Sequence, residues 1–100
     1  MMDKKADKRR QKRTKTRVLV KVDGKSGIIS DFSETGLQIS TNSLPSKKKV
    51  NIVFDVSGHR ISLDGVIQWI RRKYSFQNSL LIGCSVENAP IEYYKFVREH

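Results

Sequence analysis

The chain has 100 residues, 37% of them hydrophobic, which suffices for one modest core and leaves no room for a second. No apolar run approaches the roughly 18 residues that a membrane-spanning helix needs, so we expect no membrane insertion. The N-terminal charges are followed by no apolar segment of the kind found in secretory signals, and the single cysteine, Cys84, cannot form an internal disulfide. These features favour a cytoplasmic protein in which Cys84 is buried.

The net charge of +10 is concentrated at the N-terminus. Residues 1–17 contain nine Lys/Arg and two Asp, a net charge of +7, which leaves +3 for the remaining 83 residues. We expect residues 1–12, which include only three apolar residues, to form a flexible basic arm. Residues 13–100 are expected to form a single domain. The arm could be a solubilising tail, or it could be a clamp for phosphate or another anion.

From residue 18 onward, apolar and polar residues mostly alternate, which is the pattern of strands with one buried face. The alternation predicts six strands, at residues 17–22, 28–32, 36–40, 50–56, 60–72 and 80–87. Turn-forming residues separate these strands, and Gly65 within the fifth predicts a bulge or a sharp bend. Short strands divided regularly by turns indicate an antiparallel barrel or a sandwich.

The last segment, NAPIEYYKFVREH, has a different pattern. Asn88 can cap a helix and Pro90 can occupy its first turn, while apolar residues recur at a spacing of three. We expect one short helix that packs on the strands or closes one end of the barrel, because a helix of this length is not stable alone. Its aromatic residues are interpreted as packing residues: Tyr93, Tyr94 and Phe96.

Two short motifs lie around the first two strands. The first, R-x-x-x-R, is formed by Arg13 and Arg17 directly before the first strand, and Arg9 with Arg13 offers a second register. The second, D-x-S-x-x-G, is formed by three residues around the second turn: Asp31, Ser33 and Gly36.

In this order, and with these strands around them, the motifs resemble those of the PilZ domain family, small bacterial β-barrels that bind the second messenger cyclic di-GMP. The segment LDGVIQWI resembles the family's G-x-V strand, and LLIGCSVE resembles its penultimate strand, although Val86 stands where an aromatic residue is common. The resemblance covers most of the chain. It implies a mainly β fold, a small antiparallel β-barrel of about six strands with a short C-terminal helix. It also implies a stand-alone receptor without a cofactor, which signals by conformational change to an unidentified downstream protein.

The resemblance further implies that both motifs form the site for cyclic di-GMP. Arg13 and Arg17 match the adjacent O6 and N7 acceptors of guanine, and arginine also pairs with phosphate. Asp31 accepts hydrogen bonds from guanine N1–H and N2–H, and Ser33 adds a hydroxyl contact. Gly36 permits a positive φ and a close approach of the backbone to the ligand. Positive charge for a second, stacked ligand comes from three residues of the arm: Lys12, Arg9 and Arg10.

Other interpretations stay open at this point. The D-x-S-x-x-G turn could be purely structural, with Asp31 and Ser33 bonded to their own backbone. A nucleic-acid-binding β-barrel would suit the basic arm, but the strands offer mainly Trp69 and Phe54 for base stacking. Phe54 is expected in the core and Trp69 in the core or on the barrel surface, which argues against specific nucleic-acid binding. A third possibility is a PilZ-like protein-interaction module without a ligand. No catalytic constellation and no Cys/His metal site is recognisable, so we expect no enzyme.

Overall fold

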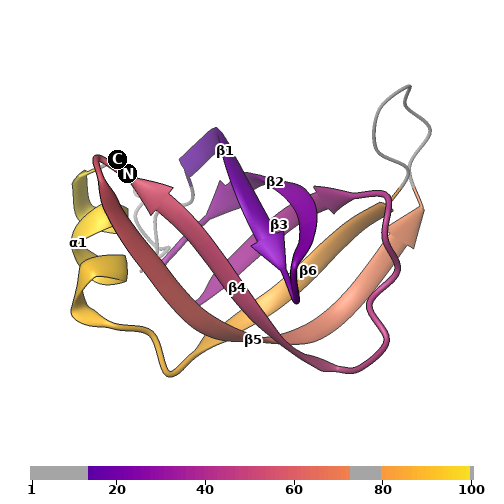
Figure 1. Cartoon of the computed structure of the whole chain (residues 1–100). Coiled ribbons are helices and arrows are strands. Elements are labelled where there is room, and N and C mark those ends of the chain that lie inside the picture. The colour runs from indigo at the N-terminus through magenta and orange to yellow at the C-terminus, as the bar shows by residue number, and fades with distance from the viewer. Residues whose placement is uncertain (1–13, 73–79, 100) are drawn as a thin grey trace, which may run out of the picture.

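The structure is a computed structural model that describes residues 14–72 and 80–99, with side chains from Arg17 onward. Six antiparallel strands close into a barrel, and one helix follows them (Figure 1). The elements are β1 (Thr14–Val22), β2 (Lys25–Phe32), β3 (Gly36–Thr41), β4 (Lys49–Val56), β5 (His59–Arg72), β6 (Leu80–Glu87) and α1 (Ile91–Glu99). Around the barrel the strands run in the order β1-β2-β3-β6-β5-β4. The predicted six-stranded barrel with a short C-terminal helix is confirmed.

The core is formed by the inward-facing residues of every strand, as the alternating sequence pattern requires. Val20 and Val22 of β1 are buried, whereas Leu19, which directly precedes Val20 and faces outward, is 77% exposed. Phe54 is buried in the core, as expected. Cys84 of β6 is also buried, and burial raises the pKa of its thiol to about 11, so the thiol is protonated at neutral pH.

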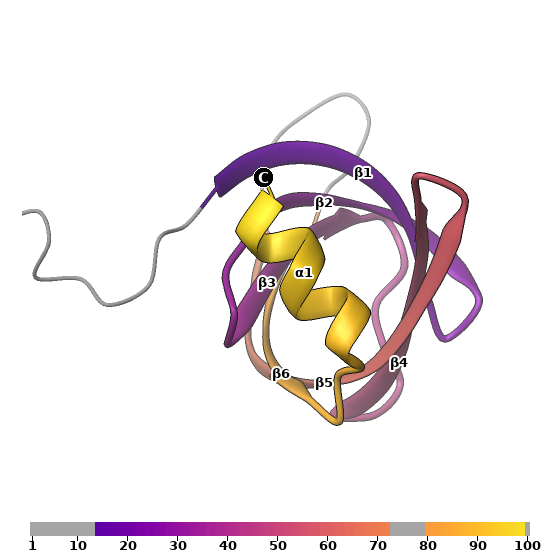
Figure 2. The ribbon, with the colours of Figure 1, turned by 90° about the vertical axis from the view of Figure 1, so that its left-hand side faces the viewer.

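Helix α1 lies across one end of the barrel, which Figure 2 shows in a view toward that end. Tyr93 and Phe96 are buried, whereas Tyr94 is half-buried. The Phe96 ring lies 4.6 Å from that of Phe32 and 5.4 Å from that of Phe54, measured between ring centroids. The helix therefore closes the core at this end, as the sequence predicted. Among the described residues, no helix is long and apolar enough to span a membrane.

Asn88 does not cap the helix as expected. It has a φ of 51°, and its side-chain amide donates a hydrogen bond to Asp64 Oδ2 over 3.0 Å. Asn88 tolerates this left-handed conformation better than most residues do, which suits the change of direction between β6 and α1.

The β1–β2 connection is tighter than the sequence suggested. The sequence predicts a turn over residues 23–27, between the first two strands. In the structure only Asp23 and Gly24 form the turn, with φ values of 51° and 84°, and β2 already begins at Lys25. Positive φ at both central residues is typical of a type I′ hairpin turn. Asp23 also fixes the hairpin to β4, because its backbone N–H donates to Asn51 O and its carboxylate accepts from Asn51 N–H, each over 2.8 Å.

Gly65 does not form the bulge that was predicted there as an alternative to a sharp bend. Gly65 pairs regularly with Val50 and Val86, and the β5–β6 register shifts between Ile67 and Trp69 instead. A Cβ atom at Gly65 would lie 2.6 Å from Ile52 Cδ1, so close core packing explains this glycine. The register of β1 shifts between Lys15 and Val18, and that of β2 between Ile29 and Asp31.

Candidate ligand-binding surface

The D-x-S-x-x-G turn connects β2 with β3 and is held from three directions. Ser33 N–H donates to Gly36 O over 2.9 Å, and Thr35 N–H donates to Ser33 Oγ over 3.4 Å. Val86 N–H of β6 donates to Thr35 O over 2.9 Å. From the helix, the Tyr93 hydroxyl donates to Ser33 O over 2.6 Å. These bonds hold the loop against β6 and α1 independently of any ligand.

Ser33 is fully buried, and its hydroxyl oxygen accepts a bond within the turn. The prediction that Ser33 bonds to the backbone of its own turn is therefore confirmed, since its hydroxyl oxygen accepts from Thr35 N–H. A direct contact of Ser33 with a ligand stays a prediction.

Asp31 lies at the register shift of β2, where it pairs with Gln38 of β3 and with Lys15 of β1. The flanking residues of Gln38, Leu37 and Ile39, are buried in the core, so Gln38 and its neighbour Asp31 belong to the outer face of the barrel. Asp31 is nevertheless only 4% exposed. A carboxylate is thus placed on the outer face of the sheet in a largely desolvated position.

Gly36 begins β3 and pairs with Ser85. Within the described residues, the glycines with positive φ are Gly24 and Gly58, so the positive φ expected of Gly36 is wrong. The residue takes an extended conformation because it already belongs to the ladder with β6. Close approach of a ligand to its backbone stays a prediction.

Arg17 lies within the register shift of β1, directly beyond the pair that Lys15 forms with Asp31, and its side chain is exposed. The irregularity thus places one arginine of the first motif next to the strand pair that contains Asp31. The remaining predicted site residues lie outside the described part of the chain: Arg13, Lys12, Arg10 and Arg9.

Trp69 is a surface residue that the sequence pattern could not place. Counted in steps of two from the buried residues Ile61 and Leu63, position 69 would face the core. The bulge at Gln68 moves Trp69 to the outer face, where its indole covers Gly83 of β6 so closely that no Cβ would fit there. The Arg71 guanidinium lies 4.6 Å from the centre of the Trp69 ring, a cation–π distance.

A shallow pocket of about 390 Å³ extends from the motif turn to this tryptophan. Thr35 and Gly36 line one side, and Trp69 lines the other. Gln68 adds polar groups, since its side-chain amide donates to Ser85 Oγ over 3.1 Å. The pocket therefore combines exposed backbone, amide groups and one aromatic plane.

These residues form one continuous strip on the outside of the sheet. Asp31 pairs with Gln38, Gln38 with Gly83, and Gly83 with Trp69, so the strip crosses three strand spacings. At about 4.8 Å per spacing this distance is roughly 14 Å. A buried carboxylate near one end, a flanking arginine and an aromatic plane at the other end suit a ligand with planar bases and negative charge. Within residues 14–72 and 80–99 no cluster of side chains suited to metal binding is present.

The sequence matches the model of the PilZ domain over residues 7–99. A search of curated proteins finds no match. Among solved structures, the fold is similar to that of the Bacillus subtilis inhibitor of motility (MotI/DgrA), with a TM-score of 0.70 and 12% sequence identity. The similarity covers 89% of this chain and 46% of that protein, so this chain spans about half the length of its structural neighbour. At this level of identity the likeness concerns the fold.

Proposed function

The chain belongs to the PilZ domain family, and on that premise we propose that it is a bacterial, cytoplasmic receptor for cyclic di-GMP that acts as an adaptor and not as an enzyme. The observation that carries the proposal is the placement of Asp31. Its carboxylate is 4% exposed on the outer face of the sheet, next to the strand irregularity that contains Arg17.

The chemistry of guanine fits this placement. Guanine presents N1–H and N2–H side by side, and the two oxygens of Asp31 can accept both hydrogen bonds. Because Asp31 is largely removed from water, adenine, which presents an N1 acceptor in place of the N1–H donor, would set acceptor against acceptor at this carboxylate, which gives selectivity for guanine. Arg17 would pair with a phosphate or with the O6 and N7 acceptors of guanine.

The remaining contacts are assigned by the same reasoning. Arg13 would supply the second guanidinium of the motif, and Trp69 offers a plane against which a base can stack when the exposed Arg71 side chain moves off the ring. Additional positive charge, sufficient for a stacked second ligand, would come from Lys12, Arg10 and Arg9. Binding would change the surface around the first strand, and a downstream protein would read that change.

The test is a calorimetric titration with cyclic di-GMP, with cyclic di-AMP and GTP as controls. Asp31→Ala should weaken binding about fivefold to 150-fold, which corresponds to about 1–3 kcal/mol for unpaired donors in a desolvated site. Asp31→Asn keeps one acceptor oxygen and should bind with intermediate affinity. Glu34→Ala is the matched control, because Glu34 is an exposed acid in the same turn. Single-stranded DNA should bind weakly and lose affinity steeply with added salt.

Each variant is also melted thermally. If Asp31→Ala binds cyclic di-GMP like the wild type and only unfolds at a lower temperature, the turn is structural and the receptor proposal is wrong. Salt-resistant, sequence-dependent binding to DNA without a response to the dinucleotide would instead favour a nucleic-acid-binding barrel.

A further inference from the structure

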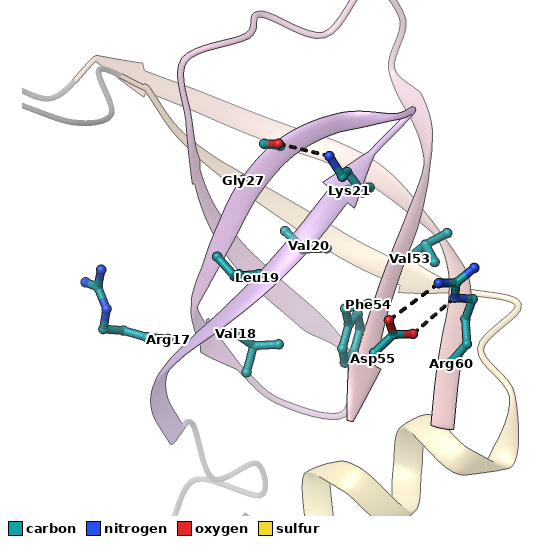
Figure 3. A pocket seen from close by; sticks show the side chains of 11 residues that line it. Arg17, Val18, Leu19, Val20, Lys21, Gly27, Val53, Phe54, Asp55 and Arg60 are labelled. Atoms are coloured by element: carbon teal, nitrogen blue, oxygen red, sulfur yellow. Dashed lines mark hydrogen bonds and ion pairs between the residues drawn. The ribbon is translucent and has the colours of Figure 1, made fainter. Parts of the chain in front are cut away.

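The barrel is only partly closed between β1 and β4. Within the described residues the β1–β4 ladder consists of two pairs, Lys21 with Val53 and Val22 with Ile52. On the N-terminal side of Lys21 the two strands separate and leave a groove of about 650 Å³. Figure 3 shows it between the strand that contains Val20 and the strand that contains Phe54. Every other strand pair of the barrel is joined over at least five residue pairs.

Backbone hydrogen-bonding groups face this groove. Asp23 N–H donates to Asn51 O, which marks a position where the two strands point their backbone groups at each other. In an antiparallel ladder such positions recur every second residue, so the next ones are Lys21 with Val53 and then Leu19 with Asp55. The ladder ends before the last of these pairs. Leu19 and Asp55 therefore turn their N–H and C=O groups toward a gap that an added strand could fill.

The floor of the groove is apolar. Val20 and Phe54 are buried core residues, and Val18 is half-buried because the opening of the barrel leaves its inner face partly uncovered. At the rim, Leu19 is 77% exposed and Val53 is half-buried. An inserted strand would need apolar side chains at every second residue to contact this floor.

The rim is basic. Arg17, Lys21 and Arg60 line it together with one acid, Asp55, a net charge of +2. The Arg60 side chain binds Asp55 over 3.0 Å, and the Lys21 ammonium donates to the neutral Ser26 Oγ over 3.1 Å, so Asp55 does not balance the positive charge of Lys21 or of exposed Arg17. This charge disfavours a second copy of the chain, whose net charge is +10, and also residues 1–12, which contain six Lys/Arg and two Asp.

We propose that the groove between β1 and β4 binds an extended segment of another protein, in which apolar residues alternate with Asp or Glu, as an added β-strand. The apolar residues contact Val18, Val20 and Phe54, and the acidic residues face Lys21 and, while no dinucleotide is bound, Arg17. The inference deepens the proposed function, because it names the surface that receives the downstream protein. Binding of the segment does not itself require cyclic di-GMP.

The probe is a seven-residue peptide with blocked ends in which valine and glutamate alternate, titrated into the full chain without dinucleotide. Amide resonances of Leu19 and Asp55 should shift saturably, and their hydrogen exchange should slow. A peptide with lysine in place of glutamate should bind at least about tenfold more weakly. Lys21→Glu should weaken binding of the glutamate peptide at least about threefold, whereas Lys25→Glu, the same charge change outside the groove, should alter it less than about twofold.

The proposal is overturned if neither amide responds, or if the glutamate and lysine peptides bind equally. Slow hydrogen exchange of both amides before peptide is added would also overturn it, because the groove would then already be occupied. If this protection grows with protein concentration, the occupant is a second copy of the chain. If it does not, the occupant is a segment of the same chain. Since the dinucleotide is absent, a negative result here leaves the receptor proposal intact. Loss of cyclic di-GMP binding in the calorimetric test, conversely, leaves the groove proposal intact.

Discussion

Gly83→Ala would test how the outer strip is assembled. The added Cβ would lie within 3.0 Å of three indole atoms of Trp69, a separation that real Cβ contacts essentially never show. The ring is the far end of a side chain, so it can swing away while the backbone stays in place. The cost is therefore the contact area that the ring loses.

The size of this cost follows from the burial of Trp69. A tryptophan buries about 150–250 Å² in a core, and half-buried Trp69 covers roughly half of that, about 100 Å². At about 25 cal/mol per Å² the complete loss of this contact costs about 2.5 kcal/mol. The cation–π contact with Arg71 adds about 0.5–1 kcal/mol at an exposed site. Because a displaced ring keeps part of its contacts, we expect Gly83→Ala to lower the free energy of unfolding by about 1–3 kcal/mol.

Urea unfolding followed by circular dichroism measures this change, and the emission of Trp69, the single tryptophan of the chain, should shift to longer wavelength. The matched control is the same substitution in a Trp69→Ala background, where the added methyl group meets no ring and should cost almost nothing. An equal cost in both backgrounds would refute the reasoning, because the backbone and not the indole would then be displaced. Unchanged stability and emission would refute it as well.

Two further predictions concern the turn and the thiol. Tyr93→Phe removes the hydroxyl that donates to Ser33 O and should lower the free energy of unfolding in urea by about 1–2 kcal/mol, and it should also weaken cyclic di-GMP binding. Tyr94→Phe, at the half-buried neighbouring residue, should change neither quantity. Unaltered stability of Tyr93→Phe would contradict the role assigned to this hydrogen bond. Burial raises the pKa of Cys84 from 9.0 to about 11, so the folded state keeps a proton that the unfolded state loses. Stability should therefore be unaffected below about pH 9 and fall between pH 9 and 11, by at most on the order of 2–3 kcal/mol; a Cys84→Ala variant with the same decline over this range would contradict the assignment.

Much of the fold could be predicted because alternation is a local property. Period two placed Val20 and Val22 in the core and separated all six strands, and the spacing after Pro90 predicted the helix. The errors arise where the choice of a residue depends on packing against a residue that is distant in sequence. Gly65 accommodates Ile52, while the bulge occurs at Gln68, which has no local marker.

The residues proposed for the site could be named from the sequence, but their geometry could not be predicted from it. The two motifs pointed to Asp31 and Ser33, yet nothing in the sequence shows that Ser33 is buried under Tyr93. Trp69 was ambiguous because its orientation depends on the bulge one residue earlier. The groove beside β1 was not predictable at all, since it depends on where a ladder between two strands ends, which is a property of the closed barrel.

The hydrogen bond from Tyr93 to Ser33 also bears on how the protein is made. It joins residues 60 positions apart, and the β3–β6 pairing that supports the same turn spans a comparable stretch of chain. Contacts of such long range slow folding, because the entropy of closing the loop is lost before the contact forms. During synthesis the segment DFSETG emerges well before its supports, so the turn acquires its final shape only after β6 and α1 have left the ribosome. A nascent chain would therefore lack the finished turn, which would form in a late step together with closure of the barrel.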